Sequence, residues 1–106
     1  MSKLIVVTLA AMLLAQSQAT AEDNMVVDMS KMTCAELTRL GFQDFAGITM
    51  WMSGYYNASV RNTVIDLDRF AQAAKAVKDH CATSPRATVM SAAERALGIK
   101  MPRRAQ

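Results

Sequence analysis

The sequence predicts a small all-α protein that consists of four helices in a single domain. One disulfide cross-links the domain, and a cleaved signal peptide precedes it. Three observations lead to this prediction. Apolar residues recur at helical spacing in four segments, and no run alternates for long enough to form a strand. The chain has two cysteines, Cys34 and Cys81. It also begins with a short basic start that is followed by an almost entirely apolar run.

The N-terminal segment predicts export. After Lys3 the chain is almost entirely apolar over residues 4–14, and Ala19-Thr20-Ala21 fits the small-x-small pattern of a cleavage site. We therefore expect a signal peptide over residues 1–21, with cleavage after Ala19 as the alternative. A membrane anchor is the competing interpretation, but the apolar run is shorter than the ~20 residues that a spanning helix needs.

The charge balance argues against a nucleic-acid partner. The chain has twelve Lys and Arg and nine Asp and Glu, and only Lys3 lies in the predicted signal peptide. Its removal lowers the formal net charge from +3 to +2. Such a small basic excess does not indicate binding to nucleic acid.

No residue pattern indicates catalysis. His80 is the only histidine, so a catalytic triad would lack a base, and its place beside Cys81 lacks the spacing of a zinc or haem site. Asp66 and Asp68 diverge on a helix, so capping explains them better than acid–base pairing. No glycine-rich phosphate loop is present. We expect no enzymatic activity, no metal and no cofactor.

Two cysteines in an exported chain of this size predict a disulfide between Cys34 and Cys81. Closing that loop constrains the unfolded chain by roughly 4 kcal/mol. The core of so small a domain supplies only about 3–5 kcal/mol, so the bridge would decide whether the chain folds. An intermolecular bond or free thiols are the alternatives.

Helix signals place one helical domain at residues 32–98. Before it, residues 22–31 are polar and predict an extended, flexible arm, with disorder as the alternative. After it, residues 99–106 form a basic tail that we expect to be solvated.

The first two helices have recognisable starts. Thr33 and Glu36 form a capping box that opens the first helix, and Gly41 is placed to end it. Asp44 can cap the second helix. That helix holds Gly47 and Gly54, which favour close backbone approach to a neighbour, with a bend at Gly54 as the alternative.

The third and fourth helices also carry boundary signals. Asp66 opens the third helix at the positive end of the helix dipole, and the helix is expected to end near Ala82. Ser84 is then expected to cap a fourth helix over residues 85–97, because proline suits the first helical position. Gly98 is placed to stop it.

The second helix carries most of the large soft side chains. Its predicted apolar face excludes Thr49, Ser53 and Asn57. Such a face usually belongs to the core, but a domain this small cannot easily cover it all, and a surplus would form a dimer face or a surface for client proteins. The residues predicted for that surface are Ile48, Met50, Trp51, Met52, Tyr55 and Tyr56, with Met50 toward the edge.

These motifs in order resemble the HdeA/HdeB family of periplasmic acid-stress chaperones, on the HdeB side. The resemblance runs from about Met29 to Leu97, and the motifs that carry it are Met32-Thr33-Cys34-Ala35-Glu36-Leu37, Trp51-Met52-Ser53-Gly54-Tyr55, Asp66-Leu67-Asp68, and Cys81 followed by Ser84-Pro85. It implies a periplasmic homodimer near neutral pH. In acid the dimer would loosen or dissociate and hold unfolding periplasmic proteins through apolar surface, without ATP.

The sequence permits an acid switch of this kind. A carboxylate paired with Lys or Arg has a folded pKa below the unfolded value of about 4, so its stabilisation is present above that value and is lost as pH falls through the folded pKa. In acid the basic residues remain and repel one another. The runner-up is a binding protein for one specific partner, similar to the Rap1a/Tai immunity proteins, and a structural envelope role is third.

Overall fold

The computed structural model describes residues 26–102. The predicted signal peptide, the start of the arm and the last four residues of the tail lie outside the described residues. The described chain forms four helices: α1 (Cys34–Thr38), α2 (Phe42–Ser59), α3 (Leu67–Thr83) and α4 (Val89–Leu97). Within residues 26–102 the only β pairing is an isolated bridge between Thr33 and Thr88. The predicted four-helix, all-α fold is therefore confirmed.

The frame of the molecule consists of α1, α3 and α4, whose backbones approach one another most closely. The predicted disulfide between Cys34 and Cys81 ties the start of α1 to the last turn of α3, with the two Cα atoms 4.8 Å apart. Both cysteines are fully buried. The loop before α4 is also fixed to α1, because the Cys34 amide donates to the Ala87 carbonyl at 2.8 Å.

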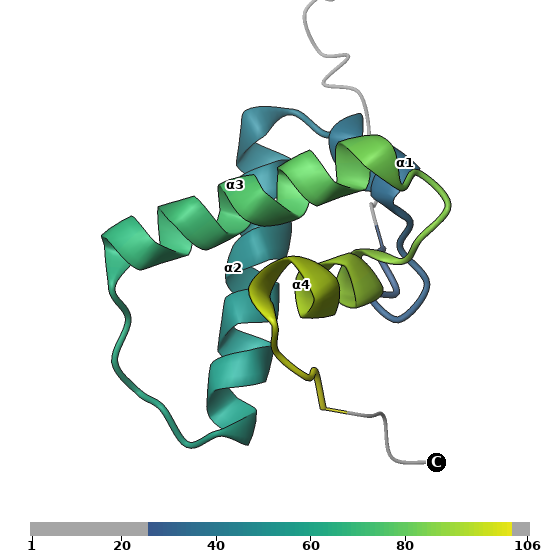
Figure 1. Ribbon diagram of the computed structural model, residues 1–106. Coiled ribbons are helices and arrows are strands. Elements are labelled where there is room, and N and C mark those ends of the chain that lie inside the picture. The colour runs from purple at the N-terminus through teal and green to yellow at the C-terminus, as the bar shows by residue number, and fades with distance from the viewer. Residues whose placement is uncertain (1–25, 103–106) are drawn as a thin grey trace, which may run out of the picture.

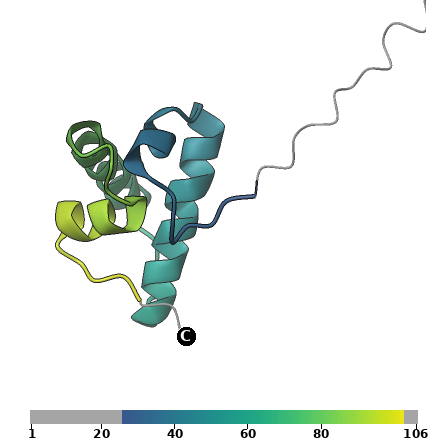
Figure 2. The same ribbon diagram turned by 90° about the vertical axis from the view of Figure 1, so that its right-hand side faces the viewer.

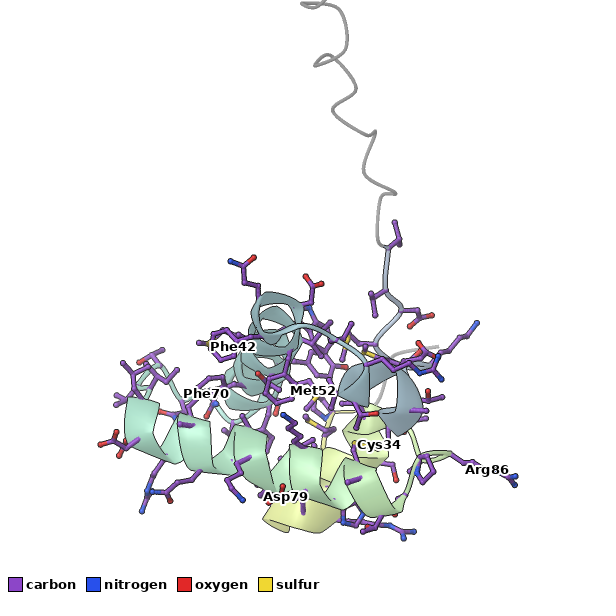
Figure 3. All side chains as sticks on the ribbon, turned by 90° about the horizontal axis from the view of Figure 1, so that it is seen from above. Cys34, Phe42, Met52, Phe70, Asp79 and Arg86 are labelled. Carbon is purple, nitrogen blue, oxygen red and sulfur yellow. A yellow bond between two sulfur atoms is a disulfide. The ribbon has the colours of Figure 1, made fainter. Side chains whose placement is uncertain are left out.

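Helix α2 is arranged differently. It stands across α3 and α4, as Figures 1 and 2 show, and its backbone approaches theirs at few points. Its contacts with the frame are therefore made chiefly by side chains. Figure 3 shows Met52 pointing from α2 toward the middle of the molecule, where it is buried.

The buried core includes residues from beyond the four helices. Leu37, Val77 and Val89 form its centre, and Met29 and Met101 close it from the two ends of the described chain, at 7% and 5% exposure. Met29, from the segment expected as a flexible arm, and Met101, from the segment expected as a solvated tail, thus pack on the domain. The helices alone leave gaps in the core, and the long unbranched side chain of methionine fills such gaps well.

Two expectations about α2 are wrong. Thr49 was placed opposite the apolar face, but it is buried and its hydroxyl donates to the Phe45 carbonyl at 2.9 Å, so its burial leaves no polar atom without a partner. Gly47 and Gly54 were expected to allow close backbone approach. A Cβ built at either glycine would have no atom within 4 Å, so no neighbour requires a glycine there.

The helix starts agree with the sequence where the signal is local. Thr33 caps α1 by accepting the Glu36 amide at 3.2 Å, and its hydroxyl donates to the Glu36 carboxylate. Asp66 caps α3 by accepting the Arg69 amide at 3.0 Å. For α2, Gly41 occupies the cap position, so the expected Asp44 cap is wrong and Asp44 lies in the first turn.

The predicted start of the fourth helix is also wrong. Helix α4 begins at Val89 and is capped by Thr88, whose hydroxyl accepts the Ser91 amide at 3.1 Å. Ser84 instead ends α3. The chain between them cannot continue as a helix, because the Pro85 and Ala87 carbonyls accept amides at the start of α1. Gly98 adopts the left-handed conformation and ends α4 as predicted.

Replacing both Cys34 and Cys81 with serine is predicted to lower the free energy of unfolding by about 4 kcal/mol, because the bridge closes a 47-residue separation. Urea denaturation of the oxidised and mutant chains measures the difference. Lys75→Ala is the control, since its exposed ion pair with Asp79 contributes little. A loss below about 1 kcal/mol would contradict the prediction.

Thr88→Ala is predicted to destabilise the protein by about 1 kcal/mol, because it removes the side-chain cap of α4. Ser84→Ala is the matched control, and thermal unfolding compares the two. The Ser84 hydroxyl caps no helix start, so Ser84→Ala should change the free energy of unfolding by no more than about 0.5 kcal/mol. Equal losses for the two variants would show that Thr88 has no special capping role.

Candidate functional site

Exposed apolar side chains gather on two parts of the described surface. On α2, Phe42, Met50 and Trp51 are 84%, 44% and 46% exposed. The second group surrounds the connection from α2 to α3 and consists of Val60, Val64, Ile65 and Leu67. So small a domain leaves much of its apolar surface uncovered.

The predicted surface on α2 is divided between solvent and core. Met50 and Trp51 are exposed, whereas Ile48, Tyr55 and Tyr56 are half-buried against the core. Met52 is only 4% exposed, so it is a core residue and its place in the predicted surface is wrong. Trp51 stacks on Tyr55 with ring centroids 4.9 Å apart, which fixes the exposed indole to the half-buried ring.

A cleft of about 510 Å³ separates α2 from α3 and α4. Its walls are mainly apolar and include Met52, Phe70 and Leu97, and Figure 3 shows Phe70 of α3 pointing toward α2. Polar groups lie among its lining residues, including Asn57 and Arg69. The volume lies in the range of small-molecule and side-chain binding sites.

A groove of about 840 Å³ runs along another side of α2. It lies between the N-terminal segment, α2, α4 and the C-terminal segment, and its walls include Met29, Trp51, Tyr55 and Met90. Met101 lines both the cleft and the groove. This single methionine therefore stands between the two hollows.

The C-terminal segment is held by two polar contacts that the sequence did not indicate. The Met101 amide donates to the Glu94 carboxylate at 2.9 Å, and the Tyr55 hydroxyl donates to the Pro102 carbonyl at 3.2 Å. Glu94 and Met101 lie seven residues apart across a helix end, and Tyr55 and Pro102 lie on distant segments. No periodic signal in the sequence links these positions.

Ion pairs contribute little to the described structure. The one ion pair within residues 26–102 joins Lys75 to Asp79 at 2.6 Å, and both side chains are largely exposed. Lys78 lies over the Phe45 ring, with 5.5 Å from its Nζ to the ring centroid. Several carboxylates bind backbone amides instead, as Asp66 and Glu94 do.

The described residues contain no group of three or more His, Cys, Asp or Glu side chains that could hold a metal ion. Over the same residues, no helix has both the length and the apolar character needed to cross a membrane. The features that stand out are thus the exposed aromatic side chains of α2 and the two apolar hollows beside them.

Comparison with known proteins identifies the family. No curated protein and no solved structure matches the chain. A family model described as the HdeA/HdeB family matches residues 4–91, which is most of the sequence and includes both cysteines, all of α2 and all of α3. The chain therefore belongs to the HdeA/HdeB family of acid-stress chaperones.

Proposed function

We propose that the protein is an ATP-independent holdase of the periplasm, which loosens in acid and binds unfolding proteins through apolar surface. The observation that carries the proposal is the exposed apolar surface of α2, set on a frame that a disulfide closes. Family membership supports the same function. Export by the predicted signal peptide over residues 1–21 is part of the proposal.

The arrangement of charges supports a response to acid. When the nine Asp and Glu are neutral, twelve Lys and Arg remain in the chain, eleven of them after signal removal. Their mutual repulsion favours expansion. Helix α2 has the fewest close backbone contacts with the frame, so it should separate first. The bridge between Cys34 and Cys81 would keep the expanded chain compact, with its apolar side chains available.

At neutral pH the same exposed residues would be covered by a second copy. Met50 and Trp51 are the two residues of the predicted surface that are more than 40% exposed, so they are proposed as the centre of the contact. Aromatic residues and methionine are enriched at such interfaces. Acid repulsion between two basic chains would separate the copies and free this surface.

The first test measures aggregation of an acid-sensitive protein by light scattering, with and without the oxidised mature chain. We expect suppression at pH 2–4 and none at pH 7, because carboxylates lose their charge below about pH 4. Binding of an apolar dye should rise in parallel. An unrelated small basic protein is the control. Absence of suppression at every pH would refute the holdase, and one tight partner at neutral pH would favour the immunity-like alternative.

Trp51→Ala is predicted to weaken dimerisation at pH 7 and to lower holdase activity per folded molecule several-fold. The fold should lose only about 1 kcal/mol, because the indole is half exposed and stacks on a single ring. Analytical ultracentrifugation and light scattering measure the two effects.

Two control variants separate surface from core in that experiment. Leu37→Ala should cost about 2–5 kcal/mol of stability and leave activity per folded molecule unchanged, because Leu37 is buried and lines neither hollow. Val60→Ala changes an exposed apolar residue outside both hollows and should lower neither the stability nor the activity per folded molecule. If Trp51→Ala leaves dimerisation and activity unchanged, Trp51 has no part in the proposed surface.

A further inference from the structure

Residues 99–102 fill the space between the two apolar hollows beside α2. Ile99 lines the cleft, Pro102 lines the groove and Met101 lines both. In Figure 2 this segment runs from the end of α4 to the lower part of α2. Met101 is 5% exposed although it lies beyond the last helix. The segment therefore occupies an apolar trough that would otherwise be open.

The contacts of this segment are those of a bound peptide. It has no helical structure, and its apolar residues, Ile99 and Met101, alternate with the exposed Lys100. One backbone amide donates to the Glu94 carboxylate and one backbone carbonyl accepts from the Tyr55 hydroxyl. Contacts of this kind recognise a main chain and two apolar side chains, and they do not depend on the rest of the sequence.

We infer that the trough beneath residues 99–102 is the site where unfolding proteins bind, and that this segment is its intramolecular occupant. The inference rests on the proposed holdase function. The partner is a non-helical peptide with apolar side chains two residues apart, so the chain itself shows the chemistry that the trough accepts. Its amide would replace that of Met101 at Glu94, and its carbonyl would replace that of Pro102 at Tyr55.

Departure of the segment would enlarge the site. Because Met101 is common to the linings of the 510 Å³ cleft and the 840 Å³ groove, its removal would join them along α2. Met29, Met52 and Met90 then lie among the walls. Methionine side chains are flexible and polarisable, so walls of this composition adapt to apolar groups of different shape. A holdase needs walls of this kind, because it binds client proteins of different sequence.

The test compares Met101→Ser with Lys100→Ser in the full oxidised chain at pH 7. The probe is a labelled peptide of residues 97–104, and its affinity is measured by fluorescence anisotropy. Met101→Ser removes the apolar anchor and should bind the peptide at least about tenfold more tightly than wild type, because an occupied trough reduces the apparent affinity. Lys100→Ser should bind like wild type, and the same peptide with serine at Met101 should bind neither variant.

Circular dichroism first establishes that each variant is folded. If Met101→Ser unfolds, Ile99→Ser takes its place, since it removes the other apolar side chain of the occupant, leaves Glu94 and Tyr55 unchanged and should raise peptide affinity several-fold. Unchanged peptide affinity in folded variants, or an equal gain in Lys100→Ser, would overturn the inference.

The peptide assay also separates this inference from the proposed function. Tight peptide binding by Met101→Ser, without suppression of aggregation by wild type in acid, would refute the holdase and with it the role of the trough in binding clients. Suppression in acid without peptide binding by any folded variant would overturn the trough alone and leave the holdase standing.

Discussion

The disulfide between Cys34 and Cys81 is the constraint on which the rest of the structure depends. It joins the start of α1 to the end of α3, and the whole of α2 lies in the loop that it closes. Helix α2 can therefore move away from the frame without leaving the domain. A loop of this length is held by the bridge at both ends, while the positions within it are fixed only by packing. The molecule thus combines a frame closed by the disulfide with one helix that is held chiefly by its side chains.

The small size of the domain explains how the core is completed. Helices α1, α3 and α4 bury short or compact side chains such as Val89 and Ala92, and they cannot also cover the aromatic residues of α2. Thr49 and Met52 face the interior and Trp51 remains half exposed. Met29 and Met101, from the chain segments on either side of the helices, fill the remaining space in the core. Few backbone hydrogen bonds hold these segments, such as the one from the Ile99 amide to the Glu94 carbonyl.

Local features of the fold could be predicted from the sequence, and non-local ones could not. The caps at Thr33 and Asp66 depend on residues three positions away, so their signals are complete within one turn. The start of α4 depends on backbone bonds from Cys34, far away in sequence, and the local proline signal was misleading. The cysteine pair was the exception, because only two cysteines exist. The contact of Glu94 with Met101 had no sequence signal at all.

How acid could act on such a molecule depends on whether its ion pairs are buried or exposed. A protein stabilised by buried ion pairs would lose its core when the carboxylates are neutralised, but the described residues hold one exposed pair. Here the carboxylates bind backbone amides at helix starts and at the C-terminal segment. The apolar core and the disulfide do not titrate, so both can persist while the total charge of the chain changes. In the proposed function, charge repulsion in acid would therefore act on a frame that persists and would release α2, whose exposed side chains include Met50 and Trp51.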